Sequence, residues 1–295
     1  MRDAATGHRP MALEIAAARV LLEPWRLLTS PLFYGVDRVP TDRPFLLVGN
    51  HTLMGVLDAP LMLLGLHERT GVIVRSLGDH VHFQVPLWRD LLTHCGAVDG
   101  TRENCEALMR AGESVLVFPG GAREVFKHKG EQYHLIWKSR TGFAALAIKH
   151  GYPIVPFAAV GAEECYDILV DSDELRQSPL GPVLEWLTPR PDEVPPLVAG
   201  IGPLPRPQRF YFRFEAPIET RRWAGRAGDQ AACLKLRAEV ARAIEHGIQL
   251  LQRARRRDPD AALAVRLARE LAGGTSGRRR AARHAGRHRG ARKRG

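Results

Sequence analysis

Apolar and polar positions alternate along this chain with two different periods, and the alternation predicts the order of its elements. Short runs rich in branched and aromatic residues are typical of strands, and the stretches between them carry the spacing of helices. The expected strands are FLLV (45–48), VIV (72–74), SVLVF (114–118), IVPFAAV (154–160) and RFYFRF (209–214). Strands that alternate with helices indicate an α/β fold.

Capping residues and helix breakers place two of the helices between these runs. Thr101 is a candidate N-cap for a helix that ends near Gly112, and a second helix is expected from Ser139 to Gly151. Residues 163–208 contain nine prolines and little periodicity. We expect this segment to be an irregular insertion that covers the sheet.

The N-terminal segment, residues 11–35, predicts an amphipathic helix that Pro24 interrupts. Two interpretations stand: the helix lies in a membrane interface, or it covers the core of its own domain. The apolar stripe consists of Leu13, Ala16, Ala17, Val20 and Leu21, and aromatic and leucine residues follow at Trp25, Leu27, Leu28, Leu32, Phe33 and Tyr34.

Composition limits the class of protein. The chain has 295 residues, 45% of them hydrophobic, which is enough to enclose a sizeable core. Its four cysteines form no CxxC pair, so their spacing indicates neither a disulfide framework nor a zinc site and favours a reducing, cytosolic-side environment. No cleaved signal is evident, and Asn50, His51 and Asp58 interrupt the longest apolar stretch, so we expect no transmembrane helix.

The net charge of +11 belongs to the C-terminal tail. Residues 253–295 contain fifteen basic residues and three acidic ones, a net charge of +12, which leaves the first 252 residues near −1. Residues 273–295 lack the apolar side chains that folding requires, so we expect disorder. The tail favours contact with an anionic membrane surface, and specific nucleic-acid binding is disfavoured because no recognition motif accompanies the charge.

Candidate chemistry lies where two expected strands end. His51 follows the run at 45–48, and a histidine there becomes a useful base if Asp58 holds its other ring nitrogen. The alternative is a buried histidine bonded to a backbone carbonyl. Gly120, Gly121 and Arg123 follow the run at 114–118. Paired glycines let backbone N–H groups approach an anion, and an arginine beside them can bind phosphate through two hydrogen bonds. The alternative is that this loop is only a tight turn.

Four blocks in this order resemble the glycerolipid (PlsC-like, lysophospholipid) acyltransferase superfamily, and in particular its diacylglycerol acyltransferase-like branch. They are NHTLMGVLD, GAVDGTR, FPGGARE and PIVPFAAVG, and the similarity spans about residues 40–165. The first block holds two more residues between its histidine and aspartate than the family pattern. The resemblance implies a mixed, mainly parallel central sheet flanked by helices, as in glycerol-3-phosphate acyltransferase.

The resemblance also implies an acyl-CoA-dependent O-acyltransferase that transfers a fatty acyl group from acyl-CoA, or from acyl carrier protein, to a lipid hydroxyl. His51 would be the general base and Asp58 would fix its tautomer. No metal or cofactor is implied beyond acyl-CoA as co-substrate. The residues implied in substrate binding are Asn50, Gly96, Arg102, Pro119, Gly120, Gly121, Arg123 and Glu124.

Gly120-Gly121-Ala122 stands where phospholipid-making members carry Glu-Gly-Thr, which is similar to the branch that acylates mono- or diacylglycerol or long-chain alcohols. A neutral acceptor is therefore favoured over 1-acylglycerol-3-phosphate. We expect a membrane-interface segment at 1–38, an acyltransferase domain at 39–252, a basic tail at 253–295, and a peripheral membrane protein on the cytoplasmic face.

Two other classes of function stay open. A lipid hydrolase or thioesterase is disfavoured because the sequence lacks a GxSxG nucleophile elbow. A non-catalytic lipid- or polyanion-binding protein would depend on residues 253–295 for its affinity. His80 and His82 have a spacing seen in metal sites, but no third ligand follows, so cavity-wall or surface histidines are favoured.

Overall fold

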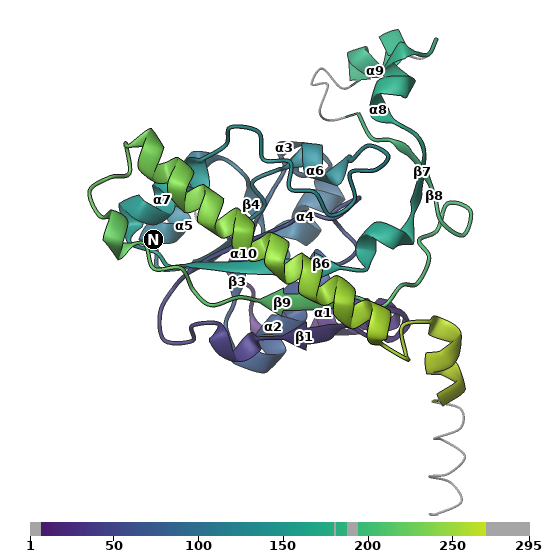
Figure 1. The fold of residues 1–295 in the computed structure, drawn as a ribbon, viewed down its shortest axis with the longest axis horizontal. Helices are drawn as coiled ribbons and strands as arrows, with labels where there is room; N and C mark the ends of the chain where they lie inside the picture. Colours follow the sequence, from purple (N-terminus) through teal and green to yellow (C-terminus); the bar gives the residue numbers. More distant parts are fainter. Residues whose placement is uncertain (1–6, 180, 188–193, 270–295) are drawn as a thin grey trace, which may run out of the picture.

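A seven-stranded sheet lies at the centre of the molecule (Figure 1). The computed structural model describes residues 7–179, 181–187 and 194–269. The strands are ordered β1-β9-β6-β2-β5-β3-β4 across the sheet. Their bounds are β1 (Leu32–Tyr34), β2 (Leu46–Gly49), β3 (Val74–Gly78), β4 (Val98–Asp99), β5 (Ser114–Val117), β6 (Ile154–Val160) and β9 (Tyr211–Phe214).

The sheet is mixed and mainly parallel, as expected. The central strand β2 is parallel to both of its neighbours, β5 and β6, and β3 is parallel to β5 and β4. The direction reverses at β9, which is antiparallel to β6 and parallel to β1. Strands β2 and β6 are buried along their whole length because helices cover both faces, which explains their continuous apolar sequences.

Helices pack on both faces of the sheet. On one face α5, α7 and α10 enclose a core, and α10 crosses that face diagonally (Figure 1). On the other face α1 and α2 enclose a second core. The helices are α1 (Ala12–Thr29), α2 (Ala59–Thr70), α3 (His80–Gln84), α4 (Pro86–His94), α5 (Arg102–Arg110), α6 (Ala122–Val125), α7 (Gly142–His150), α8 (Ser172–Gln177), α9 (Gly181–Leu187) and α10 (Gln230–Arg257), with short 3-10 turns η2 (Val36–Arg38), η3 (Ala162–Cys165) and η5 (Arg221–Trp223).

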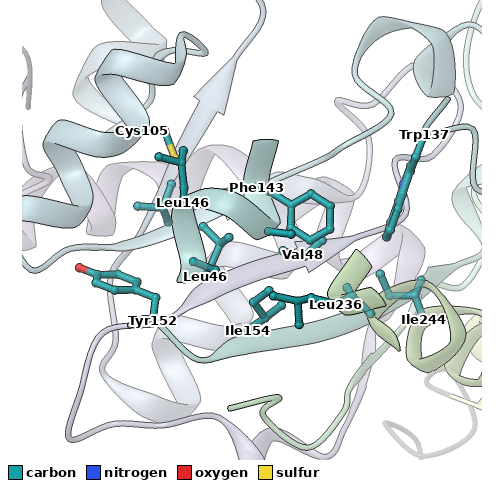
Figure 2. Packing of buried hydrophobic residues seen from close by; sticks show 14 of the residues in the cluster. Leu46, Val48, Cys105, Trp137, Phe143, Leu146, Tyr152, Ile154, Leu236 and Ile244 are labelled. Carbon is teal, nitrogen blue, oxygen red and sulfur yellow. The ribbon is translucent and has the colours of Figure 1, made fainter. Parts of the chain in front are cut away.

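The core on the α10 face anchors β2, the strand that leads to His51. Fully burying one such apolar side chain contributes about 1.5–3 kcal/mol, so this packing fixes the strand firmly. Figure 2 shows the side chains that meet there: Leu46 and Val48 from β2, Phe143 and Leu146 from α7, Ile154 from β6, and Leu236 and Ile244 from α10.

Helix α1 continues through Pro24, which corrects the expected break. A proline removes one backbone donor, and tertiary packing here offsets that loss. Leu22 and Trp25 pack against the core on the α2 face, and the Trp25 indole donates to the carbonyl of Leu57 at 2.8 Å. The opposite side of α1 is exposed, and Leu13 is 80% exposed. The helix therefore covers its own domain with one side and leaves an apolar side facing solvent.

The insertion is more regular than expected. Strands β7 (Asp167–Val170) and β8 (Leu197–Ala199) pair antiparallel, with α8 and α9 between them in the chain. This unit projects away from the sheet at the upper right of Figure 1 instead of covering it. Local strand pairing satisfies its backbone groups, and proline-rich composition alone did not reveal that pairing.

The expected segment boundaries are also displaced by packing. Strand β1 lies within residues 1–38 yet pairs with β9, so the end of that segment belongs to the central sheet. Helix α10 continues past 252 to Arg257. The tail for which disorder was expected, 273–295, lies outside the described residues. Among the helices that the structure describes, none is both long and apolar enough to cross a membrane.

Candidate active site

Three loops converge at the carboxyl edge of the three central strands. Residues 50–58 follow β2, residues 118–121 follow β5 and η3 follows β6. Parallel strands bring their carboxyl ends to the same edge of a sheet, where α/β proteins assemble their sites. The histidine block and the glycine block, 70 residues apart in the sequence, therefore come together.

The backbone of His51 is held from three sides. Its N–H donates to Glu124 Oε2 at 3.3 Å, and its carbonyl accepts from Lys127 Nζ at 2.6 Å. The preceding residue, Asn50, is buried and bonds with its side-chain amide to both the N–H and the carbonyl of Ala159 in β6, at 2.9 and 3.0 Å. Asn50 thus joins the end of β2 to β6, a role that explains its identity without substrate contact.

The imidazole of His51 lies flat against a neighbouring ring. It stacks on Phe118, with ring centroids 3.9 Å apart and planes 11° from parallel. The residue is half-buried, and Nδ1 is buried with no hydrogen-bond partner among the residues that the structure describes. Burial, with smaller contributions from the charges of Lys127 and His82, lowers the pKa of His51 to about 3. The ring is therefore neutral at physiological pH, the form that accepts a proton.

Asp58 does not bond to His51, which corrects the expected pair. Its Oδ1 accepts from the Thr52 hydroxyl at 2.9 Å, and the side chain is buried at the start of α2. The loop between them turns through Met54, whose φ is 63°, and brings Thr52 to the carboxylate. Burial, opposed by the hydrogen bond from Thr52, raises the pKa of Asp58 to about 6.

The paired glycines are explained by their own loop. A Cβ at Gly120 would stand 2.1 to 2.3 Å from side-chain atoms of Glu124. Gly121 has φ 53° and ψ −145°, a conformation that other residues rarely adopt. The guanidinium of Arg140 donates to the carbonyls of Pro119 and Gly120 and braces the loop.

The side chain of Glu124 contacts the backbone of the site. Its side chain is fully buried, and its two oxygens accept from the backbone of His51 and from the N–H of Ile136, the latter at 2.9 Å. Burial raises its pKa, against the favourable charge of Lys127. Both interactions of this carboxylate fix the backbone of the site, and its expected role in substrate binding stays a prediction.

Arg123 and Gly96 also make contacts within the chain. Arg123 donates to Glu131 Oε1 at 2.6 Å and to the carbonyl of Phe126 at 3.4 Å. Burial is the largest influence on Glu131 and opposes its ionisation, but the hydrogen bonds from Arg123 and from the N–H of His128, together with the charges of both residues, outweigh it and lower the pKa. Gly96 lies after α4, where its carbonyl accepts from the buried Arg75, so packing explains it. These contacts of both residues are therefore within the chain, and a substrate-binding role for either stays a prediction.

Arg102 is exposed at the first turn of α5. Its charge acts on Cys233, near the start of α10, and no interaction joins it to the residues around His51 that the structure describes. His80 bonds to Asp99 at 2.9 Å. The indole of Trp88 donates to Nδ1 of His82 at 3.2 Å, and His82 is close enough to influence the pKa of His51.

The sequence did not indicate Lys127, Glu163 or Arg140 as parts of the site. Lys127 lies in the polar stretch FKHKGE, which is typical of an exposed loop, yet its side chain is buried and bonds to Glu163 Oε1 at 2.5 Å. A charged residue is recognised as buried only once its partner is known, and this partner is 36 residues away. Long-range pairing of this kind leaves no periodic signal.

The comparisons with known proteins relate part of the chain to a family. Residues 31–160 match the family model described as Acyltransferase. The chain is 30% identical over 82% of its length to phytyl ester synthase 2, chloroplastic, of Arabidopsis thaliana, and 29% identical over 79% to phytyl ester synthase 1, chloroplastic, of the same plant. These matches cover 37% and 36% of the two relatives, so the chain corresponds to little more than a third of their length.

Two further similarities are more limited. The chain is 32% identical over 42% of its length, and over 37% of the relative, to the human protein named DGAT1/2-independent enzyme synthesizing storage lipids. A crystal structure of the 1-acyl-sn-glycerophosphate (LPA) acyltransferase PlsC from Thermotoga maritima has a TM-score of 0.45 and 16% sequence identity, covering 82% of this chain and 84% of that one.

Proposed function

We propose that this chain, whose residues 31–160 match the acyltransferase family model, transfers a fatty acyl group from acyl-CoA to the hydroxyl of a neutral lipid, with His51 as general base. Acyl carrier protein is the alternative donor. The relatives are named for phytyl esters and storage lipids, which agrees with a lipid acceptor.

The observation that carries the neutral acceptor is the pairing of Arg123 with Glu131 at 2.6 Å. An acceptor with a phosphate needs a cation with free donors, and a guanidinium gains most from two parallel hydrogen bonds to one anion. Arg123, the residue of the glycine block suited to that task, is occupied by the carboxylate of its own chain. A mono- or diacylglycerol or a long-chain alcohol brings no phosphate and needs no such cation.

In the proposed reaction the neutral imidazole of His51 takes the proton from the acceptor hydroxyl as its oxygen attacks the thioester carbonyl. The tetrahedral intermediate collapses, the carbon–sulfur bond breaks, and the proton passes to the coenzyme A thiolate. Products are an ester and free thiol. Each step uses side chains of this chain, and the proposal requires no metal.

Asp58 keeps a role in this proposal as the counter-ion of the imidazolium formed during the reaction. Its carboxyl group lies in the same loop as His51, and the hydrogen bond from Thr52 is the contact that it would exchange. A carboxylate beside the ring raises the proton affinity that burial has lowered. In this proposal Asp58 and His51 form an ion pair only during the reaction, while the imidazole is protonated.

The exposed side of α1 supports peripheral membrane association, which we propose for the cytoplasmic face. Leucine and valine side chains there would enter the interface, while the other side of the helix stays packed on α2. The exposed residues are Leu13, Val20, Leu21, Leu27 and Leu28. A lipid alcohol in the bilayer would then reach the enzyme without passing through water.

The test is thiol release from palmitoyl-CoA with a panel of acceptors, with products identified by mass spectrometry. We expect release to depend on a neutral lipid alcohol and kcat to fall by about 10²–10⁴ in His51→Ala. His246→Ala, an exposed histidine on α10, is the matched control and should keep full activity. Release without any acceptor would indicate a thioesterase, and preference for 1-acylglycerol-3-phosphate would establish the phospholipid alternative. Vesicle binding with no turnover of either donor would leave the non-catalytic lipid-binding function.

A specificity variant tests the acceptor argument separately. Glu131→Gln removes the charge that neutralises Arg123, so turnover of 1-acylglycerol-3-phosphate should rise relative to diacylglycerol, by about tenfold for one recovered charge-assisted contact. Lys129→Gln changes a neighbouring exposed charge as the control. An unchanged acceptor ratio in Glu131→Gln would refute this account of selectivity.

A further inference from the structure

A lysine and a glutamate are buried together beneath the His51 loop. Lys127 is 0% exposed and Glu163 is 2% exposed. Lys127 follows α6, the helix that continues from the loop at 118–121, and Glu163 lies in η3 after β6, so the pair joins the chain segments of two of the three loops that meet at the site. Removing both charges from water costs more than an apolar pair of similar volume would, so stability alone does not explain this arrangement.

The lysine contacts the third loop as well. Nζ donates to Glu163 Oε1 at 2.5 Å and to the carbonyl of His51 at 2.6 Å. The other buried carboxylate near this lysine is Glu124, which accepts from the N–H of His51. Both backbone groups of His51 therefore end on buried charged side chains, and these side chains lie within one electrostatic cluster.

We infer that Lys127 and Glu163 are positioning residues, which hold His51 where it accepts the proton of the acceptor. This inference rests on the proposed function. The ammonium group supplies a hydrogen-bond donor to the His51 carbonyl, and the glutamate keeps that donor in place. An apolar pair could fill the space but could not direct the imidazole.

The cation also acts on the protonation of His51. The charged or titratable groups around the ring are Lys127 after α6 and His82 in α3, both of which lower its pKa in addition to burial. Glu124 in α6 meets the ring's own backbone, and Glu163 partly offsets the charge of Lys127. Removal of the lysine charge should therefore raise the pKa of His51, whereas a purely structural contact would leave it unchanged.

The test is the double variant Lys127→Met/Glu163→Gln, which leaves no lone buried charge. We expect kcat to fall at least about tenfold with a smaller change in KM, because the geometry of proton transfer is what the pair supports. The acid limb of kcat/KM should move upward by roughly half a pH unit or more. Ile244→Ala, in the core on the α10 face, is the control that loses stability without a shift of the acid limb.

A second measurement does not depend on turnover. The ring nitrogens of His51, assigned with His51→Gln, are titrated by NMR in the wild type, the double variant and Lys127→Arg. The arginine variant keeps the charge, so its His51 titration should match the wild type even where its kcat falls; it also carries the test if the double variant does not fold.

A double variant with wild-type kcat and an unshifted acid limb would overturn the inference. So would a Lys127→Arg variant whose His51 titrates at a higher pH than in the wild type. Wild-type protein that turns over no acyl donor with any acceptor would instead overturn the proposed function, and the two failures are thereby distinguished.

Discussion

Substitution of Asp58 by asparagine distinguishes the observed loop from the one expected from sequence. In the structure the carboxylate is buried and accepts a hydrogen bond from the Thr52 hydroxyl. Asparagine has nearly the same shape, keeps an oxygen to accept from the Thr52 hydroxyl and carries no charge. We therefore expect Asp58→Asn to stabilise the fold at neutral pH and to lower activity.

The size of the effect follows from the pKa. Burial raises the pKa of Asp58 from 3.8 to about 6, and each unit corresponds to about 1.4 kcal/mol, so the ionised side chain costs on the order of 3 kcal/mol. Between pH 4 and 6 the folded state holds a proton that the unfolded state has lost. Wild-type stability from this group therefore falls as pH rises through that window, and stays lower above it.

The assay is chemical denaturation of both proteins from pH 3.5 to 8. The difference in unfolding free energy should be near its minimum below pH 4 and grow to about 3 kcal/mol in favour of Asp58→Asn above pH 6. Asp42→Asn, an exposed substitution, should show no such growth. If Asp58→Asn is instead less stable than the wild type at neutral pH, the carboxylate is paired with a charged His51 in the resting protein, and the reasoning fails.

Two further substitutions test the loop and the surface. Gly120→Ala should lower the melting temperature and reduce activity at least about tenfold, because its Cβ would displace Glu124 from the His51 backbone. The control is Gly142→Ala at the start of α7, where a Cβ meets open space; it should be neutral or stabilising by up to about 1 kcal/mol. Equal changes in melting temperature of the two variants by calorimetry would contradict this prediction. Val20→Asp, at a side chain 75% exposed on α1, should weaken co-sedimentation with phosphatidylglycerol vesicles several-fold, and unchanged binding would show that this side of the helix does not meet the membrane.

Much of the fold follows from local patterns in the sequence. The run IVPFAAV matches β6 residue for residue, and FLLV and SVLVF lie within one residue of β2 and β5. Thr101 caps α5 as expected, accepting from the N–H of Asn104. These features were predictable because strand composition and helix caps depend on residues close together in the chain.

The boundaries that failed depend on distant partners. Pro24 lies inside α1 because Trp25 is anchored on α2, and β1 is a strand because β9 is beside it. The proline-rich insertion forms the β7–β8 pair across nearly thirty residues. No local period records such contacts, so composition alone predicted a break at Pro24, a segment boundary at residue 38 and an irregular loop.

By itself the sequence determined which chemistry is present and in what order: an apolar N-terminal helix, a histidine after one buried strand and a glycine pair after a later one. Only the tertiary structure decided what each group faces. In the folded chain Asp58 is hydrogen-bonded to Thr52, Arg123 to Glu131 and Lys127 to the carbonyl of His51. The reason is physical: a buried charge is stable only with the partner that folding brings to it, and that partner is set by the meeting of loops and not by spacing along the chain.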